Sequence, residues 1–481
     1  MTSEELLELI NRVVQSRSEY QNIELKAAKK GCPEKFYDTL SSFSNRDDGG
    51  IIIFGIDEKD NFNLCGVYDL QDIQQKITEQ CNAMTPIIRP LFSYAEMNDR
   101  FFCSVEVPSV DITERPCYYS GKGRLKGSYI RVGTCDEPMT EYEVYSYEAY
   151  RKKYQDDIRL IPRVSENALD TKSFEKYIEI LSELKPNLSK LSKEQIMELM
   201  SLKVNGQYSL VSTVLFGIYP QAYFPQLCII ATAIPGDEIG DTGDKEERFL
   251  DNIRIEGTIQ EMLIQAISFV RKNTRTKTIV DSKTGERRDV SDYPITAVRE
   301  VVLNALVHRD YSIHTEGMPI QLQIFKNRIE ITNPGGLYGR ISLDKLGQVQ
   351  PDTRNPVLAT ALELLKITEN RYSGIPTIRR EMAEYGLPAP QFLETRGSFK
   401  VILWGEDSEV LDGKKSCSEK DILAFCAIPR SRQDIAEFLG IKAIKYATQK
   451  YVAPLVISGE LQMTIPEHPK SPAQRYFSKK E

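Results

Sequence analysis

The sequence has no apolar run near the ~20 residues that a helix needs to cross a bilayer. Its opening, MTSEELLELINRVV, is acidic and helical in period. We therefore expect neither a membrane span nor a signal or transit peptide, and we expect a cytoplasmic protein that does not bind membranes. Histidine is scarce, with three in 481 residues, and the nine cysteines contain no Cys-x-x-Cys pair. These shortages disfavour zinc knuckles and disulfide frameworks, and they indicate a reducing compartment.

Two further absences disfavour whole classes of enzyme. The chain contains no G-x-x-x-x-G-K-[ST] motif, which disfavours a P-loop helicase or motor. The tripeptide at residues 308–310 is that of a kinase catalytic loop, but Thr315 stands where that loop requires asparagine. A net charge of -7 disfavours indiscriminate coating of nucleic acid and leaves room for a local basic patch. The length suits about three domains of ~100–200 residues each.

The most informative stretch is residues 293–311, YPITAVREVVLNALVHRDY. Its apolar residues recur at helical spacing, so the pattern predicts a buried amphipathic helix. Glu300 and Asn304 are four residues apart and therefore share one face of that helix. We expect this face to look into a crevice, where a cation with bound phosphates would supply the missing partner. The alternative is a polar pair that bridges to a neighbouring loop.

Two glycine turns accompany this helix. Residues 319–325 and 328–332 alternate apolar and polar side chains, which predicts two strands of a half-buried sheet. Gly335 and Gly336 follow directly, at a strand end, and allow close approach of the backbone to a ligand. Further on, Ser373-Gly374 runs into another predicted helix, whose N-terminus is suited to phosphate.

An E-x-x-x-N helix followed by two glycine turns resembles the nucleotide site of the GHKL ATPases. The match is closer to a divergent branch in bacterial regulator-like proteins, on residues 300–311, 328–336, 354–356 and 373–375. The resemblance implies ATP and Mg²⁺, with Glu300 positioning the attacking water and Asn304 binding the metal. Two residues depart from the pattern: Asn333 stands in place of an adenine-binding aspartate, and Tyr372 stands where a glycine is common. The implied nucleotide-binding residues are Asn304, His308, Asn333, Gly335, Gly336, Ser373 and Gly374.

Residues 19–26 and 42–58 resemble the AlbA-type domain that bacterial regulators share with the Schlafen proteins. This resemblance implies nucleic-acid binding. In Schlafen nucleases two glutamates and a further acidic residue hold the catalytic metal, and the matching residues are Glu19, Glu24 and either Asp57 or Glu58. The alternative is structural, because Lys26 lies on the same face of the predicted strand as Glu24 and can pair with it.

Two basic segments are candidate nucleic-acid contacts. Residues 120–134 combine four cations with four glycines, which predicts a hairpin that lies on a phosphate backbone; a solvated turn is the alternative. Residues 419–481 resemble a winged helix-turn-helix, whose third helix or its entry carries three lysines. Winged helices also serve as protein-docking modules. The candidate residues are Lys122, Arg124, Lys126, Arg131, Lys442, Lys445 and Lys450.

These segments predict a multidomain α/β and α+β protein. We expect an AlbA-type domain at residues 1–155, a GHKL-like α/β sandwich with an N-terminal extension at 156–405, a linker at 406–418 and a winged helix at 419–481. Within the extension, the patterns predict helices at 173–184, 192–200 and 258–272, and strands at 210–219 and 226–236.

Three functions remain open at this point. The leading prediction is a transcriptional regulator that binds ATP and DNA and forms a homo-oligomer, with ATP either hydrolysed or only sensed. The second is a metal-dependent nuclease, in defence against foreign nucleic acid, with the ATP module as its sensor. The third is a binding scaffold whose ATP site has decayed.

Overall fold

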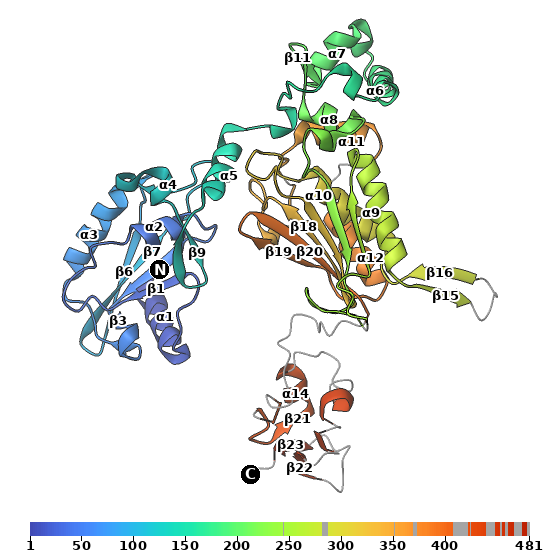
Figure 1. Ribbon diagram of the computed structural model, residues 1–481. Coiled ribbons are helices and arrows are strands. Elements are labelled where there is room, and N and C mark those ends of the chain that lie inside the picture. Colours follow the sequence, from blue (N-terminus) through green and yellow to red (C-terminus); the bar gives the residue numbers. More distant parts are fainter. Residues whose placement is uncertain are drawn as a thin grey trace.

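The computed structural model describes residues 1–243, 245–280, 287–350, 352–368 and 373–406, together with parts of the C-terminal segment at 422–423, 425–438, 448–452, 455–456, 460–465 and 474–478. It shows an N-terminal lobe joined to a larger central body, with a small C-terminal unit beyond (Figure 1). Every helix in these ranges is too short or too polar to cross a membrane.

The N-terminal lobe is a three-layer structure around a four-stranded sheet. The strands lie in the order β1 (Ile23–Lys26), β2 (Gly50–Phe54), β7 (Arg100–Val107) and β6 (Leu91–Met97). Its helices are α1 (Ser3–Ser16), α2 (Tyr37–Ser44) and α3 (Leu70–Asn82). Side chains alternate along β2: Ile53 packs with α1, whereas Ile52 and Phe54 pack with α2 and α3. The strand therefore reads as continuously apolar because both of its faces are covered.

The glycine-rich basic segment departs from the prediction. Residues expected at a hairpin tip form the helical turns η2 (Ser120–Lys122) and α4 (Gly123–Gly127), and only then does the hairpin of β9 (Tyr129–Val132) and β10 (Cys135–Pro138) begin. Gly127 packs so closely that an added Cβ would lie 2.6 Å from the carbonyl oxygen of Tyr119. Gly127 therefore serves close packing of a short helix here. Helix α5 (Glu141–Lys152) follows and leads into the central body.

The central body is a two-layer α/β sandwich. Its sheet has the order β14 (Asp251–Ile255), β13 (Ile229–Ala233), β17 (Ile320–Ile324), β18 (Arg328–Pro334), β20 (Ser398–Trp404) and β19 (Gln391–Thr395). Neighbouring strands are antiparallel except for the parallel pair β13 and β17. One face carries α9 (Ile259–Asn273), α10 (Ile295–Val307) and α12 (Gly374–Glu384). A hairpin of β15 (Thr276–Val280) and β16 (Arg287–Ser291) projects from this body (Figure 1).

A helical cap packs on one end of the sandwich and shares its core. It consists of α6 (Thr171–Leu184), α7 (Lys193–Leu199), the short strands β11 (Lys203–Val204) and β12 (Gln207–Tyr208), and α8 (Leu210–Phe216), beside α11 (Pro356–Leu364). The prediction of a strand at 210–219 is wrong, because this segment is α8. Ser209 caps that helix by accepting a hydrogen bond from the backbone N–H of Ser212. Every residue of α8 is buried, so its apolar run had no periodicity to separate helix from strand.

The C-terminal unit contains α14 (Arg432–Phe438), a helical turn η8 (Thr448–Val452) and a three-stranded sheet of β21 (Arg430–Ser431), β23 (Arg475–Ser478) and β22 (Leu461–Met463). Lys442, Lys445 and the side chain of Lys450 lie outside the described residues, so the winged helix stays a prediction. The mixed α/β multidomain organisation expected from the sequence is confirmed.

Candidate functional site

A cavity of about 660 Å³ opens between α10, the end of β18, the loop that follows β18 and the start of α12. Its size lies within the ~300–1,000 Å³ usual for small-molecule sites. The structure brings together here every residue that the sequence assigned to the nucleotide, although they span more than one helix, strand and loop. The lining includes Glu300, Asn304, His308, Asn333, Gly335, Gly336, Ser373 and Gly374.

Glu300 and Asn304 face the second glycine turn. A Cβ added at Gly374 would lie 3.0 Å from Asn304 Nδ2 and 3.2 Å from Glu300 Oε2, so the turn reaches both side chains directly. The Glu300 side chain is 22% exposed and its Oε1 lies 3.2 Å from the guanidinium of Arg299. The E-x-x-x-N pair and the N-terminus of α12 therefore form one wall, with backbone N–H groups next to a carboxylate and an amide.

Asn333 and Gly335 line the cavity at the end of β18. Asn333 is 6% exposed, and its Oδ1 has no hydrogen-bond partner among the described residues. A buried amide oxygen without a donor is costly, so this atom is suited to a ligand N–H. Gly335 has φ +101°, and an added Cβ would lie 2.4 Å from Arg354 Nη1. Only glycine fits this position, on grounds of both backbone conformation and space.

Cations that the sequence analysis did not assign also line the cavity. Four basic side chains, Arg299, Arg354, Lys366 and Arg380, stand against the two acids Glu300 and Asp352. Arg354 is buried, lies 3.0 Å from Asp310 Oδ2, donates to Gly336 O at 3.3 Å and stacks on the Tyr338 ring. It belongs to the motif at 354–356, which was the available signal. The balance of charge favours an anionic ligand.

His308 ends α10 at the mouth of the cavity. Its ring can be reached from the cavity, while the surrounding protein lowers its pKa to about 4 by desolvation, with a smaller effect from the charge of Arg354. The imidazole is therefore neutral at pH 7 and offers one donor and one acceptor. Arg309 and Asp310, which follow it, are buried.

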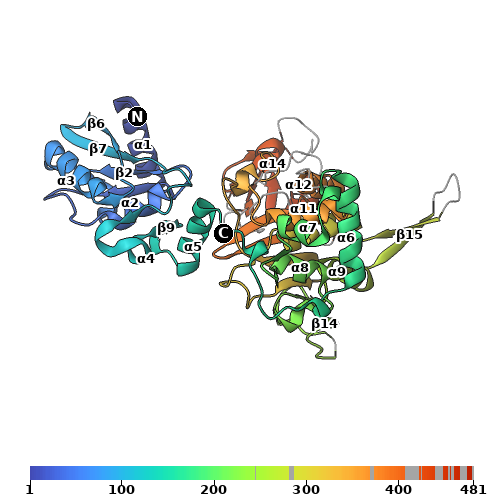
Figure 2. The same ribbon diagram turned by 90° about the horizontal axis from the view of Figure 1, so that it is seen from above.

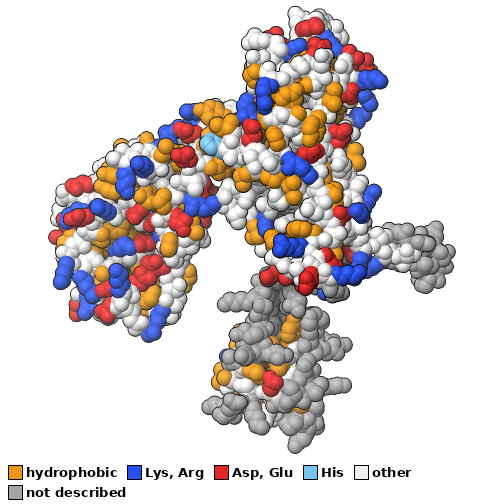
Figure 3. Space-filling view, viewed as in Figure 1, with side chains coloured by type: hydrophobic (Ala, Val, Ile, Leu, Met, Phe, Trp, Pro, Cys, Tyr) orange, Lys and Arg blue, Asp and Glu red, His pale blue; other side chains and the backbone are white. Residues whose placement is uncertain are grey.

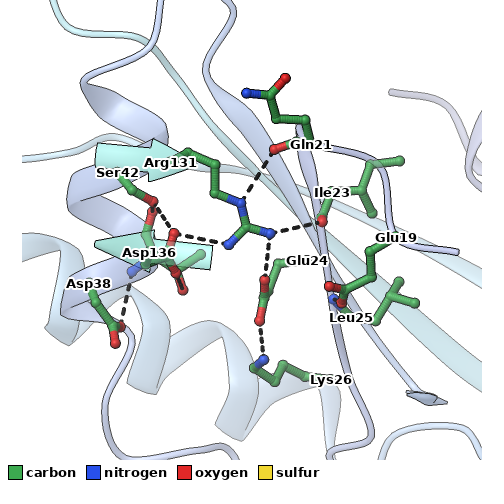
Figure 4. A network of polar contacts seen from close by, with 11 residues as sticks. Glu19, Gln21, Ile23, Glu24, Leu25, Lys26, Asp38, Ser42, Arg131 and Asp136 are labelled. Carbon is green, nitrogen blue, oxygen red and sulfur yellow. Dashed lines mark hydrogen bonds and ion pairs between the residues drawn. The ribbon is translucent and has the colours of Figure 1, made fainter. Parts of the chain in front are cut away.

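The predicted metal carboxylates of the N-terminal lobe have other partners. Glu24 Oε2 accepts from Arg131 Nη2 at 2.9 Å, and Lys26 pairs with Oε1, as Figure 4 shows. Arg131 also pairs with Asp136 at 2.9 Å, and its side chain is 1% exposed. The prediction that Arg131 contacts nucleic acid is wrong, because burial between two carboxylates makes it a structural cation. The Glu24–Lys26 pair is the alternative that the sequence left open.

Glu19 and Asp57 are two further acids of the predicted metal site. Glu19 Oε1 accepts from the backbone N–H of Leu25 at 2.9 Å, and its pKa is raised by desolvation and by the charges of Glu24 and Glu58. Asp57 pairs with Lys29 at 3.0 Å, which lowers the pKa of that carboxyl. No group of three or more His, Cys, Asp or Glu side chains within the described ranges is arranged to hold a metal ion.

The remaining basic candidates of this lobe differ in how available they are. Arg124 pairs with Glu148, and Lys122 donates to the Tyr129 hydroxyl at 3.1 Å. Lys126 is exposed on α4. On the face seen in Figure 3, basic and acidic side chains are interspersed over the N-terminal lobe. Any phosphate contact made on this face therefore depends on individual cations.

Comparison with known protein families matches three separate segments of the chain. Residues 19–140 match the family "Schlafen, AlbA_2". Residues 317–403 match an HATPase family described as "Putative ATP-dependent DNA helicase recG C-terminal". Residues 421–477 match the C-terminal domain of Fic-like proteins, "filamentation induced by cAMP". None of the curated proteins compared with the chain matches it.

Two solved structures are also similar to the chain. The DIP2311 protein from Corynebacterium diphtheriae is 16% identical, with 93% of this chain and 92% of that chain covered and a TM-score of 0.40. The N-terminal domain of a RecG-related protein from Nitrosomonas europaea is 25% identical, with 27% of this chain and 90% of that chain covered and a TM-score of 0.23. By its family matches, the chain joins a Schlafen AlbA_2-like domain to a RecG C-terminal, HATPase-like domain.

Proposed function

We propose that the chain is a regulatory protein that binds ATP with Mg²⁺ in the central cavity and binds DNA through its N-terminal lobe. The two family matches relate it to ATP-dependent proteins that act on nucleic acid. The proposal goes beyond these matches in Mg²⁺ as the metal, in DNA as the nucleic acid, in transcriptional regulation, and in a homo-oligomeric, cytoplasmic state. Residues 1–155, 156–405 and 419–481 are the domains that this proposal uses.

The observation that carries the proposal is the convergence of four elements on one cavity. Asn333 lines the cavity and its buried amide oxygen lacks a donor among the described residues, which suits the exocyclic amine of adenine. The turn at 373–374 directs the N-terminus of α12 into the same cavity, which suits phosphate. Both features line one cavity, and a nucleotide needs a site of this kind for its base and its phosphates.

Glu300 and Asn304 supply the remaining roles. The Asn304 amide oxygen is a hard ligand of the kind that Mg²⁺ prefers when phosphates complete its coordination. Bound there, Mg²⁺ would neutralise charge on the phosphates. The Glu300 carboxylate stands one helical turn away and is placed to accept a proton from a water beside the phosphates. The site is therefore equipped for hydrolysis as well as for binding.

The test is titration calorimetry of the full chain with MgATP, run beside an assay for phosphate release. We expect MgATP binding that falls in Asn304→Ala and persists in Glu300→Ala, with turnover lost in the latter. Glu363→Ala, on α11 and away from the cavity lining, is the matched control for Glu300→Ala. Failure of the unmodified chain to bind ATP would support the decayed-site scaffold instead.

A metal-dependent nuclease is the second candidate. The observation in its favour is that Glu19 lies close enough to Glu24 and Glu58 for their charges to raise its pKa. Against it, both oxygens of Glu24 are held by cations. Incubation with RNA and DNA in Mg²⁺ or Mn²⁺ separates the candidates. If the unmodified chain cuts and Glu24→Gln does not, the nuclease stands; if the chain binds without cutting, the regulator stands.

A further inference from the structure

Helix α5 lies between the N-terminal lobe and the central body in both views of the molecule (Figures 1 and 2). It follows directly on the segment that matches the AlbA_2 family, which ends at residue 140. Three of its side chains, Tyr142, Tyr145 and Tyr150, carry hydroxyls that donate to aspartates. Of these aspartates, Asp352 lines the cavity, and Asp310 pairs with Arg354, which also lines it. The lobe therefore touches the candidate nucleotide site through defined hydrogen bonds.

The first of these bonds reaches the buried cation of the cavity. The Tyr142 hydroxyl donates to Asp310 Oδ2 at 2.7 Å, and the same oxygen lies 3.0 Å from Arg354 Nη1. One carboxylate oxygen is thus shared between a tyrosine of the lobe and an arginine of the cavity. Asp310 and Arg354 are both nearly inaccessible to solvent, so little water screens this chain of contacts.

A second bond reaches the loop that covers the cavity. The Tyr150 hydroxyl donates to Asp352 Oδ2 at 3.0 Å, and the backbone N–H of Arg340 donates to the same oxygen at 3.0 Å. The Tyr150 ring also meets the Tyr338 ring edge-on at 5.4 Å. Asp352 and Tyr338 both line the cavity. Through Tyr150 the lobe therefore contacts this loop at Asp352 and at Tyr338. These contacts add to the one between Tyr142 and Asp310.

We propose that Arg354 is the phosphate-contacting cation of this cavity, and that Tyr142 is its positioning residue, acting across the lobe boundary through Asp310. The inference rests on the proposed ATP site. Arg354 lines the cavity, next to the turn at 335–336, with a guanidinium suited to bidentate contact with phosphate. A phosphate that binds this guanidinium competes with Asp310 for it. When the Asp310 carboxylate loses contact with Arg354, the hydrogen bond from the Tyr142 hydroxyl helps to satisfy that carboxylate.

The direction of the effect follows from this competition. Without the Tyr142 hydroxyl, Asp310 keeps Arg354 and Ser312, whose backbone N–H donates to Oδ1 at 2.8 Å. Asp310 then holds the guanidinium more firmly and the phosphates gain less from it. Affinity for ATP should fall, whereas affinity for adenosine, which has no phosphate, should not change. By linkage, bound ATP strengthens the contact of α5 with the central body by the same factor.

The experiment compares ATP and adenosine on the full chain. We expect Arg354→Lys to weaken ATP on the order of tenfold, because a point charge replaces a charge-assisted fork. We expect Tyr142→Phe to weaken ATP by about fivefold, the lower end of usual coupling between sites. Neither variant should change adenosine affinity. Tyr145→Phe is the matched control, because it removes a hydroxyl from the same helix that donates to Asp156 at 3.1 Å.

The outcomes separate this inference from the function on which it rests. If the unmodified chain binds no ATP, the proposed function and the inference both fall. If it binds ATP and Tyr142→Phe behaves like Tyr145→Phe, or if either test variant weakens adenosine as much as ATP, the inference alone is overturned. Should Arg354→Lys melt early, Tyr142→Phe decides the matter by itself, since it changes no charge and no volume beyond one oxygen.

Discussion

Two buried arginines show how a single residue type serves different ends. Arg131 is enclosed by Glu24 and Asp136, which neutralise it with two carboxylates. Among the described residues Arg354 has one carboxylate partner, Asp310, and it lines the cavity. Both lie within segments singled out by sequence: Arg131 by the cation and glycine spacing of residues 120–134, and Arg354 by the resemblance at residues 354–356. The number of acidic partners and the opening onto the cavity, which sequence does not give, distinguish the two arginines.

Replacing Arg131 tests the structural role at this scale. Arg131→Ala should destabilise the N-terminal lobe by about 3–5 kcal/mol, because it leaves Glu24 and Asp136 without their shared cation in a nearly buried site. Urea unfolding followed by circular dichroism measures this loss. Lys122→Ala, which removes an exposed cation from the same segment, should change stability by less than about 1 kcal/mol. Equal stability of the two variants would contradict the assignment.

At the scale of elements, periodic segments were predictable and uniform ones were not. Helix α10 and strands β17 and β18 follow their patterns to within a few residues, and the patterns also placed Glu300 and Asn304 on one face. Helix α8 was predicted as a strand because it is buried all round and so lacks a polar face. Helix α4 was missed because glycine predicts a turn from sequence, whereas here Gly127 serves close packing. In both cases tertiary packing determines the secondary structure, which the local sequence preference does not.

Helix α4 is also where a nucleic-acid contact can be measured. Lys126 is exposed, whereas Arg124 pairs with Glu148. If α4 lies on a phosphate backbone, Lys126→Ala should weaken DNA binding and reduce the slope of log affinity against log salt by about one. Fluorescence anisotropy over a salt series gives that slope. Lys193→Ala, on α7 of the central body, is the control, and an unchanged slope in Lys126→Ala would remove α4 from the interface.

The start of α11 carries a pH dependence. Desolvation raises the pKa of Asp157 to about 6, although the carboxyl accepts the backbone N–H groups of Leu358 and Val357. Because the folded pKa lies above the unfolded value of 3.8, the native state binds more protons between pH 4 and 6. Stability contributed by this group is therefore greatest below about pH 4 and is lost as pH rises through 6, by about 3 kcal/mol in all.

Asp157→Asn isolates this contribution from other carboxyls. The free energy of unfolding should fall with rising pH in the unmodified chain more steeply than in the variant, across pH 4 to 6. Above pH 7 the two curves should run parallel. Urea titrations at several pH values supply the comparison. Parallel curves across the whole range would show that the two N–H groups of α11 keep Asp157 ionised throughout.

At the scale of the whole molecule, one arginine joins the two bodies where α5 begins. Arg396, in the turn between β19 and β20, donates to both oxygens of Glu143 at 2.8 Å and to Glu137 at 2.7 Å. A further bond runs to the carbonyl of Pro138 at 2.8 Å. Its side chain is 37% exposed, so each ion pair contributes only about 0–1 kcal/mol. Arg396 is therefore suited to set the position of the lobe without being needed for folding.

This placement predicts a change in the linkage between ATP binding and DNA binding. If ATP and DNA bind to the two bodies and communicate through their contact, ATP must change DNA affinity by the same factor by which DNA changes ATP affinity. Arg396→Ala should shrink both factors towards one, because it loosens the contact while the cavity and α4 keep their residues. DNA affinity measured without ATP should stay within about twofold, as expected for a site that the substitution does not touch. The matched control is Arg254→Ala, which removes an equally exposed arginine whose carboxylate partner, Glu256, lies in the same body.

Anisotropy with and without MgATP gives one factor and calorimetry with and without DNA gives the other. A full factor retained in Arg396→Ala, or lost equally in Arg254→Ala, would show that communication between the bodies does not pass through this contact.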